Sequence, residues 1–319
     1  MSAALAGRRR ALLSKLTGAP DPHCIDTIQS LWSGYGSLER WRLSPGQTII
    51  LKRIAPPAQA SHPRGWNSDL AHRRKLNSYR VEAKWYRRTP LPGTPRQPNC
   101  VAVASLESET LLLLEDLDAS GFALRVSQPD ETQIELCIQW LAQFHAAHLG
   151  QSSEGLWPQG SYWHLDTRPE EWARMTDARL QGAAHWLDDQ LKTCPYQTLI
   201  HGDAKLANFC FADSAVAAVD FQYVGGGVGV VDLAYLLGCA YEGPDLAKMT
   251  PYWLDRYFDL LLLALRAHPV DGADLESCWR ALYPVAVADF ARFLDGWAPD
   301  HWKINDYNKS LVAQLLERR

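Results

Sequence analysis

The sequence predicts an α+β fold with two lobes, a β-rich N-terminal lobe at residues 1–117 and a mainly helical C-terminal lobe at residues 118–319. Three observations support this prediction. Short runs of β-branched and apolar residues, separated by turns that contain glycine or proline, fill the first third of the chain. Longer patterns with an apolar helical face follow after residue 130. The segment Glu115-Asp116-Leu117-Asp118 falls between the two patterns, where a hinge is expected.

The first third is expected to contain five strands and one helix. Tight turns at residues 33–37 and 44–47 separate the first three strands. A proline-rich loop at residues 55–66 precedes a helix that Asn67-Ser68-Asp69 can cap and that runs to about Arg88. The strands are expected at residues 27–32, 38–43, 48–54, 100–106 and 110–117.

The remainder of the chain is expected to be mainly helical. A helix at residues 131–149 places Ile134, Ile138 and Leu141 on one apolar face. Residues 169–192 are expected to form one continuous helix. Further helices are expected at residues 231–240, 251–268, 274–294 and 305–319, and short strands at residues 198–200, 209–211 and 216–219.

The composition is that of an ordinary globular protein and argues against several classes. A net charge of −4 gives no general reason to expect a nucleic-acid partner. The seven cysteines lack C-x-x-C spacing, which argues against a zinc site or a disulfide framework and favours a reducing compartment. The apolar runs at residues 111–114 and 260–265 are too short to cross a bilayer, and no apolar segment of the kind found in signal peptides follows Arg8-Arg9-Arg10. We therefore expect a cytoplasmic protein with no membrane partner.

The most informative motif is His201-Gly202-Asp203, followed by Asn208 and then by Asp220-Phe221-Gln222. Phosphoryl transfer from ATP needs a carboxylate that accepts or orients a hydroxyl proton, and it needs oxygen ligands for the Mg²⁺ ions that neutralise the transferred group. The order H-x-D-x-x-x-x-N, then D-F-x, is that of a kinase catalytic loop and metal loop. Asp203 is therefore the candidate base, and Asn208 and Asp220 are the candidate Mg²⁺ ligands.

Each of these residues has a plainer explanation when it is taken alone. Asp203 alone is a turn-forming residue of a solvated loop, and Asp220 can cap a turn as easily as hold a metal. A carboxylate at the end of a buried strand nevertheless needs a partner, and Mg²⁺ is a good one. The combined spacing favours the metal site. Lys205, two residues after Asp203, can either reach the γ-phosphate as a catalytic residue or point into solvent.

The candidate nucleotide contacts lie in the first third of the chain. Lys52 is in the middle of a strand and either points inward to the phosphates of ATP or faces solvent. Glu82, near the middle of the following helix, either orients Lys52 or is one more surface carboxylate. Gly34 and Gly36 can cover the phosphates with backbone N–H groups or form an ordinary hairpin turn, since the third glycine of G-x-G-x-x-G is absent. The hinge adds two candidate contacts, Glu115 and Leu117.

Three other features are expected to be structural. The glycine-rich segment at residues 225–229 is not followed by Gly-Lys-Ser or Gly-Lys-Thr, so we expect a flexible turn and not a phosphate loop. Asp232 is expected to cap the next helix or to hold the catalytic loop by hydrogen bonds. His201 is expected to brace the same loop and not to transfer protons.

On these motifs the sequence resembles the aminoglycoside phosphotransferase and choline-kinase-like superfamily, and within it the ecdysteroid-kinase-like (CHK) branch, where His-Gly-Asp and Asp-Phe-Gln are typical. The resemblance covers nearly the whole chain and is strongest from His201 to Tyr235. It implies a bilobal protein-kinase-like fold in which the first lobe binds ATP and the second is catalytic and binds the substrate. It also implies transfer of the γ-phosphate to a small-molecule hydroxyl. The implied roles are base for Asp203, Mg²⁺ ligands for Asn208 and Asp220, ATP lysine for Lys52, and its partner for Glu82.

Two alternative functions stay open at this point. A protein kinase is disfavoured because Gln222 replaces the last glycine of Asp-Phe-Gly and because only about ten residues separate Asp220 from the next expected helix, which leaves no activation segment. A nucleotide-binding pseudokinase is disfavoured because the motif is intact. For a small-molecule kinase, we expect the acceptor in the helical lobe, with two or three aromatic residues after residue 240 lining its pocket. A hydrophobic alcohol is favoured over choline, because no acidic cluster accompanies these aromatics.

Overall fold

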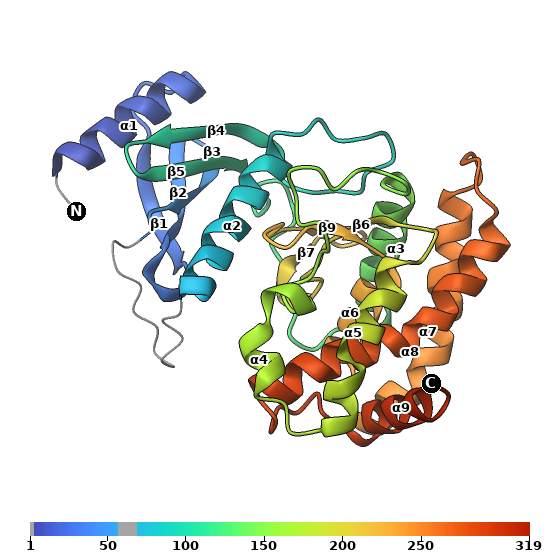
Figure 1. The fold of residues 1–319 in the computed structure, drawn as a ribbon. Coiled ribbons are helices and arrows are strands. Elements are labelled where there is room, and N and C mark those ends of the chain that lie inside the picture. The colour runs from blue at the N-terminus through green and yellow to red at the C-terminus, as the bar shows by residue number, and fades with distance from the viewer. Residues whose placement is uncertain (1–2, 57–68) are drawn as a thin grey trace.

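The structure, a computed structural model, describes residues 3–56 and 69–319 and consists of a β-sheet region joined to a larger helical region (Figure 1). The sheet has five antiparallel strands in the order β1-β2-β3-β5-β4. The predicted α+β fold, β-rich first and helical afterwards, is confirmed. The strands are β1 (His23–Ser30), β2 (Gly36–Ser44), β3 (Gln47–Ile54), β4 (Cys100–Leu106) and β5 (Glu109–Glu115).

Helix α1 (Ala3–Thr17) is a part of the fold that the sequence reasoning did not find. It lies along the outer side of the sheet near β4 (Figure 1). Leu13 is fully buried there against Ile49 and Leu51 of β3. The three consecutive arginines interrupt any apolar stripe, so the helix has no clear amphipathic pattern, and its stability depends on the sheet that it covers.

Helix α2 (Asp69–Tyr86) lies on the other side of the sheet, towards the helical region (Figure 1). Strand β3 is therefore covered on both faces. Because successive side chains of a strand point to opposite faces, Leu51 packs towards α1 while Lys52 points towards α2. Most of the proline-rich loop predicted at residues 55–66, and Asn67 and Ser68 of the predicted cap, lie outside the described residues.

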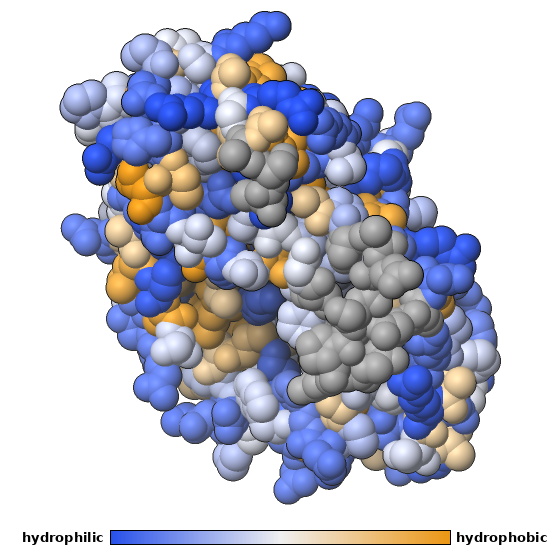
Figure 2. Space-filling view, turned by 90° about the vertical axis from the view of Figure 1, so that its left-hand side faces the viewer, coloured by the Kyte–Doolittle hydropathy of each residue, from blue (hydrophilic) through white to orange (hydrophobic). Residues whose placement is uncertain are grey.

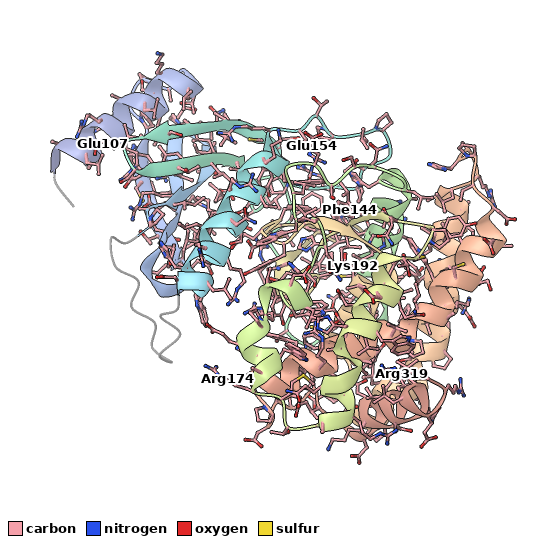
Figure 3. All side chains as sticks on the ribbon, in the orientation of Figure 1. Glu107, Phe144, Glu154, Arg174, Lys192 and Arg319 are labelled. Carbon is pink, nitrogen blue, oxygen red and sulfur yellow. The ribbon has the colours of Figure 1, made fainter. Side chains whose placement is uncertain are left out.

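The helical region is built around α3 (Glu131–Ala147), which begins with a capping box between Asp130 and Gln133. Its buried face includes Phe144 in the interior of this region (Figure 3). No helix in the described part of the chain is long and apolar enough to cross a membrane. The other helices are α4 (Pro169–Ala173), α5 (Ala178–Lys192), α6 (Val230–Ala240), α7 (Gly243–Ala264), α8 (Gly272–Trp297) and α9 (Asp306–Glu317).

Two predicted helices have different bounds in the structure. The helix expected at residues 169–192 is divided into α4 and α5, because the carboxylate of Asp295 accepts hydrogen bonds from the backbone N–H groups of Thr176 (2.7 Å) and Asp177 (3.0 Å). These groups would otherwise sit inside a helix. Helix α7 begins at Gly243, eight residues before the predicted start, and continues through Pro251.

The predicted flexible turn at residues 225–229 is wrong. Its first three glycines form strand β9 (Gly225–Gly227), which pairs with β6 (Thr198–Ile200) directly before the catalytic motif. A Cβ atom at Gly225 would lie 2.3 Å from the carbonyl oxygen of Trp157, and one at Gly229 would lie 2.2 Å from the hydroxyl of Tyr257. The segment is therefore rich in glycine because of tight packing and not because of flexibility.

Candidate active site

A cavity of about 1030 Å³ lies between the sheet region and the helical region. Its lining comes from β2, β3, β5 and α2 on one side, and from the catalytic loop, α6 and α8 on the other. The face in Figure 2 is hollowed between the two regions, with apolar side chains in the hollow. The cavity contains Lys52, Glu82, Glu115, Leu117, Asp203, Lys205, Asn208 and Asp220, which are eight of the ten site residues predicted from the sequence.

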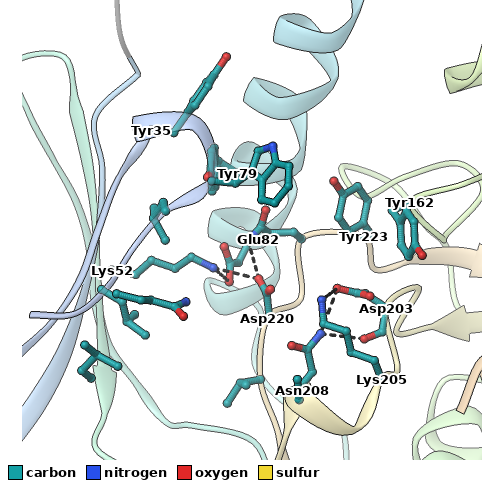
Figure 4. A pocket seen from close by; sticks show the side chains of 18 of the residues that line it. Tyr35, Lys52, Tyr79, Glu82, Tyr162, Asp203, Lys205, Asn208, Asp220 and Tyr223 are labelled. Carbon is teal, nitrogen blue, oxygen red and sulfur yellow. Dashed lines mark hydrogen bonds and ion pairs between the residues drawn. The ribbon is translucent and has the colours of Figure 1, made fainter. Parts of the chain in front are cut away.

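Lys52 joins two carboxylates that are distant in sequence (Figure 4). Its ammonium lies 2.7 Å from Glu82 Oε1 on α2 and 3.0 Å from Asp220 Oδ1. Burial alone would lower the pKa of Lys52, but the two carboxylates raise it above its ordinary value. A cation held between two acids on opposite sides of a cavity is suited to bind the phosphates of a nucleotide.

Glu82 is almost completely buried, and its Oε2 has no hydrogen-bond partner among the described residues. Burial raises the pKa of Glu82 to about 7, although the ammonium of Lys52 opposes this shift. Glu82 can therefore hold the ammonium of Lys52 in place only while the Glu82 carboxyl group is ionised.

The catalytic loop is held by a buried carboxylate. Asp232 of α6 accepts hydrogen bonds from the backbone N–H groups of His201 (2.6 Å) and Gly202 (2.9 Å). Gly202 has φ of 78°, and a Cβ atom there would lie 2.2 Å from the carbonyl oxygen of Tyr223. His201 Nε2 donates to the carbonyl oxygen of Val219 (3.0 Å), which ties this loop to the residue before Asp220. Both Asp232 and His201 therefore brace the loop, as the sequence predicted.

Asp203 is buried at the end of this loop with its two oxygens in different environments. Oδ2 accepts hydrogen bonds from Lys205 Nζ (3.1 Å) and Asn208 Nδ2 (3.1 Å), whereas Oδ1 has no partner in the described structure. Burial raises the pKa of Asp203, and the ammonium of Lys205 only partly offsets this effect. A carboxylate with one fixed and one free oxygen is suited to accept the proton of a bound hydroxyl.

Asn208 and Asp220 present oxygen atoms to the same part of the cavity. The amide nitrogen of Asn208 is used by Asp203, so its amide oxygen lies on the opposite side, as Figure 4 shows. Asp220 has φ of 69°, an uncommon backbone conformation, and Gln222 Nε2 donates to its Oδ1 (2.5 Å). Burial opposes ionisation of Asp220, but Lys52 holds its pKa below the ordinary value. The side chain is thus a carboxylate at neutral pH.

This donor set fits Mg²⁺. Mg²⁺ prefers oxygen ligands and usually keeps several waters or phosphate oxygens beside one or two carboxylates. No group of three or more His, Cys, Asp and Glu side chains in the described ranges could hold a metal by itself. One carboxylate and one amide oxygen agree with a metal that is shared with a nucleotide.

The remaining predicted contacts differ in their position. Gly34 ends the short 3₁₀ helix Trp32–Gly34 and Gly36 begins β2, and neither contributes to the cavity lining formed by the described residues, whereas Tyr35 between them does. A Cβ atom at Gly36 would lie 1.8 Å from the carbonyl oxygen of Arg53, so packing of the turn requires this glycine. Glu115 lines the cavity, but Ser120 (2.6 Å) and Arg96 use its carboxylate.

Several lining residues were missed by sequence reasoning. They come from three separated segments and include Tyr162, Arg168, Tyr235 and Lys303. No local motif marks them, because only the packing of α6, α8 and the loop after α8 brings them together. Among the described aromatic residues after residue 240, Phe290, Phe293 and Trp297 line the cavity.

Comparison with known proteins identifies the class. The model of the phosphotransferase enzyme family (APH) matches residues 27–278, which is most of the chain, and the chain therefore belongs to this family of enzymes. A search of the curated proteins finds no match.

Two solved structures share the kinase-like fold. The chain is similar to a microcompartment-associated aminopropanol kinase, with 14% identity, a TM-score of 0.54, and coverage of 98% of this chain and 97% of that chain. It is also similar to an amicoumacin kinase, hAmiN, in complex with AMP-PNP, Ca²⁺ and Ami, with 12% identity, a TM-score of 0.50, and coverage of 100% and 95%.

Proposed function

We propose that this enzyme transfers the γ-phosphate of ATP to a hydroxyl group of a small molecule. One observation carries the proposal. Asp203, whose buried Oδ1 has no partner in the described structure, lines the same cavity as the ion pair formed by Lys52 and Asp220. In the reaction, the acceptor oxygen forms a bond to the γ-phosphorus while the bond to the bridging oxygen of ADP breaks. The hydroxyl proton passes to Asp203.

Each side chain has a proposed role. Lys52, oriented by Glu82, binds the phosphates of ATP, and Lys205 stabilises the charge of the transferred group next to Asp203. Mg²⁺, held by Asn208 and Asp220, would neutralise the phosphate oxygens. The hinge residues Glu115 and Leu117, which line the cavity, are proposed nucleotide contacts, whereas Gly34 and Gly36 are not among the described residues that line it and are not proposed as contacts.

Three finer assignments are also proposals. The His-Gly-Asp and Asp-Phe-Gln motifs support the ecdysteroid-kinase-like branch. The end of β5 at Glu115 supports a boundary between an ATP-binding lobe at residues 1–117 and a catalytic lobe at residues 118–319. All seven cysteines are free thiols, which supports a cytoplasmic location.

The competing functions predict different results in one experiment. The enzyme is incubated with Mg²⁺-ATP and a panel of hydroxylated metabolites, and both ADP formation and nucleotide-dependent thermal stabilisation are measured. We expect stabilisation by ATP and ADP formation that depends on the alcohol. Stabilisation without turnover on any alcohol would favour a pseudokinase. A protein kinase is disfavoured because α6 begins at Val230, ten residues after Asp220.

Replacing Lys52 by alanine is expected to raise the KM for ATP, or to lower kcat, by roughly 10–100-fold, the scale of a lost hydrogen bond to a charged group. The variant also leaves Glu82 and Asp220 without their common cation. Steady-state kinetics with varied ATP measures the effect, and Lys84→Ala, an exposed lysine of α2, is the matched control. Equal KM and kcat for Lys52→Ala and the control would show that Lys52 does not serve the nucleotide.

The kcat/KM for ATP is expected to rise with pH through about 7. Below that pH Glu82 is protonated in the free enzyme and no longer fixes Lys52, because burial raises the Glu82 pKa to about 7. The buried His148 and His164 do not explain such a step, since burial lowers their pKa values to about 4. The pH profile of Glu82→Gln should be flat near pH 7 and lower throughout. A step near pH 7 that persists in this variant would assign it to another group.

A further inference from the structure

The cavity continues beyond Asp203, away from Lys52, into the helical region. We call this part the acceptor half, and the aromatic residues Tyr162, Tyr235 and Phe290 line it. Tyr162 and Tyr235 place their hydroxyls 3.2 Å apart. Burial is the main cause of their raised pKa values, and the charge of Asp203 adds to it, so both tyrosines lie close to the proposed base. Figure 4 shows Tyr162 on the same side of the cavity as Asp203.

Lys303, in the loop between α8 and α9, carries an ammonium without an acidic partner. Its side chain is buried and lines the cavity. Nζ lies 4.5 Å from the centre of the Tyr235 ring and donates to Cys239 Sγ (2.7 Å). Burial raises the pKa of the Cys239 thiol, so this partner is neutral at physiological pH. No Asp or Glu of the described chain pairs with Lys303.

Arg168 adds a second cation to the lining of this part of the cavity. Its guanidinium lies 5.9 Å from the Tyr162 ring centre. Nε donates to the carbonyl oxygen of Tyr162 (2.6 Å), and Nη1 donates to Glu171 Oε1 (3.0 Å). The Nη2 group makes no hydrogen bond within the described residues and is not among the buried unsatisfied atoms, so it remains available at the cavity.

Arg74 of α2 is close enough to Arg168 to feel its charge. Like Lys303, it has no hydrogen bond or ion pair to an acid in the described structure. It donates to the carbonyl oxygen of Thr167 (2.7 Å). Its pKa is lowered to about 10, first by burial and then by the like charge of Arg168. The acceptor half therefore has an excess of positive charge. Its four cations are Lys205, Lys303, Arg168 and Arg74, whereas the acids that pair with them or act on them there are Asp203, Glu171 and Glu170.

A buried ammonium without a counter-ion is costly, because the aromatic rings and the thiol beside Lys303 replace only part of the hydration that it loses. A bound anion would remove this cost. A cationic acceptor would instead lie beside Lys303 and Arg168 and be repelled by both. Resting on the proposed phosphotransferase function, we propose that the acceptor is an anionic alcohol, whose carboxylate or phosphate binds Lys303 and Arg168 while its hydroxyl faces Asp203.

The test compares acceptors that differ only in charge. With Mg²⁺-ATP, we would measure ADP formation on 4-hydroxybutanoate and 4-(hydroxymethyl)benzoate, on the matching neutral amides, on glycerol 3-phosphate with glycerol, and on choline. We expect kcat/KM for the anionic member of at least one pair to exceed that of its neutral partner by roughly 100-fold, the scale expected when buried charged donors are left unpaired. The preferred pair shows whether the anion is a carboxylate or a phosphate. Equal or higher values for the amides, glycerol or choline would overturn the inference and leave the proposed function in place.

Binding is measured separately from turnover. Thermal stabilisation by each probe in the presence of Mg²⁺-AMP-PNP should be specific to the anionic members. Lys303→Gln should weaken that binding roughly 10–100-fold, Lys303→Arg should restore most of it, and Lys309→Gln, an exposed lysine of α9, should match the wild type. The same stabilisation in Lys303→Gln as in Lys309→Gln, or none with any anionic probe, would overturn the inference. Anion-specific stabilisation without any ADP formation would instead count against the proposed function alone.

Discussion

Replacing Asp220 by asparagine is expected to abolish Mg²⁺-dependent ATP turnover without unfolding the protein. The substitution removes the carboxylate that is proposed to hold the metal and that lies 3.0 Å from Lys52. Bound cations supply much of the charge neutralisation in phosphoryl transfer, so a neutral amide at this position leaves the transferred group unstabilised. The fold should survive, because asparagine tolerates the left-handed backbone conformation that residue 220 adopts, with φ of 69°.

The measurement needs a readout that separates the metal from Lys52. Thermal stabilisation by ATP is compared with and without Mg²⁺. We expect Mg²⁺ to increase the stabilisation of the wild type and to have no effect on Asp220→Asn. Asp213→Asn, an exposed residue in the turn before β8 (Val216–Ala218), makes the same chemical change and is the control. A folded Asp220→Asn enzyme with unchanged activity would refute the metal assignment.

Asp203→Asn is expected to lower kcat by roughly 10²–10⁴-fold, the usual effect of losing a positioned acid–base group. Asparagine can keep the acceptor oxygen that receives the hydrogen bonds of Lys205 and Asn208. Its amide nitrogen then takes the place of Oδ1, the oxygen without a partner, and cannot accept a proton. The loss should therefore be chemical and not structural.

The KM for ATP separates this role from nucleotide binding. It should change by less than about threefold in Asp203→Asn, since Asp203 is proposed to face the acceptor and Lys52 the phosphates. Single-turnover kinetics with saturating ATP would show the slow step directly, again with Asp213→Asn as the control. If the variant lost affinity for ATP but kept its turnover number, Asp203 would have to be reassigned to the nucleotide.

Much of the site could be predicted because its parts are close in sequence. Asp203, Asn208 and Asp220 lie within eighteen residues, and two short strands, β7 (Phe209–Phe211) and β8, return the chain between them. A motif of this kind is readable because the local chain alone brings its groups together. The pairing of Lys52 with Glu82, thirty residues apart, was an expectation from the strand and helix patterns, and in the structure the two side chains lie 2.7 Å apart.

Other parts depended on contacts that no local pattern records. Helix α1 has no apolar stripe and is stable only on the sheet. Asp295, more than a hundred residues away in sequence, divides the helix expected at residues 169–192 by binding two backbone N–H groups. The glycines of β9 are read as flexible from the sequence, whereas the neighbouring Trp157 makes them a packed strand.

The sequence by itself determined the change from a β-rich first third to a helical remainder and the chemical groups available for phosphoryl transfer, because periodicity and motif spacing are local properties of the chain. Only the tertiary structure decided what surrounds the acceptor. Lys303 follows α8 and Arg168 precedes α4, and each would be an ordinary surface cation in an isolated segment. Packing buries both beside Tyr162 and Tyr235. Lys303 has no acidic partner among the described residues and Arg168 has only Glu171, so burial turns the excess of positive charge into a binding preference.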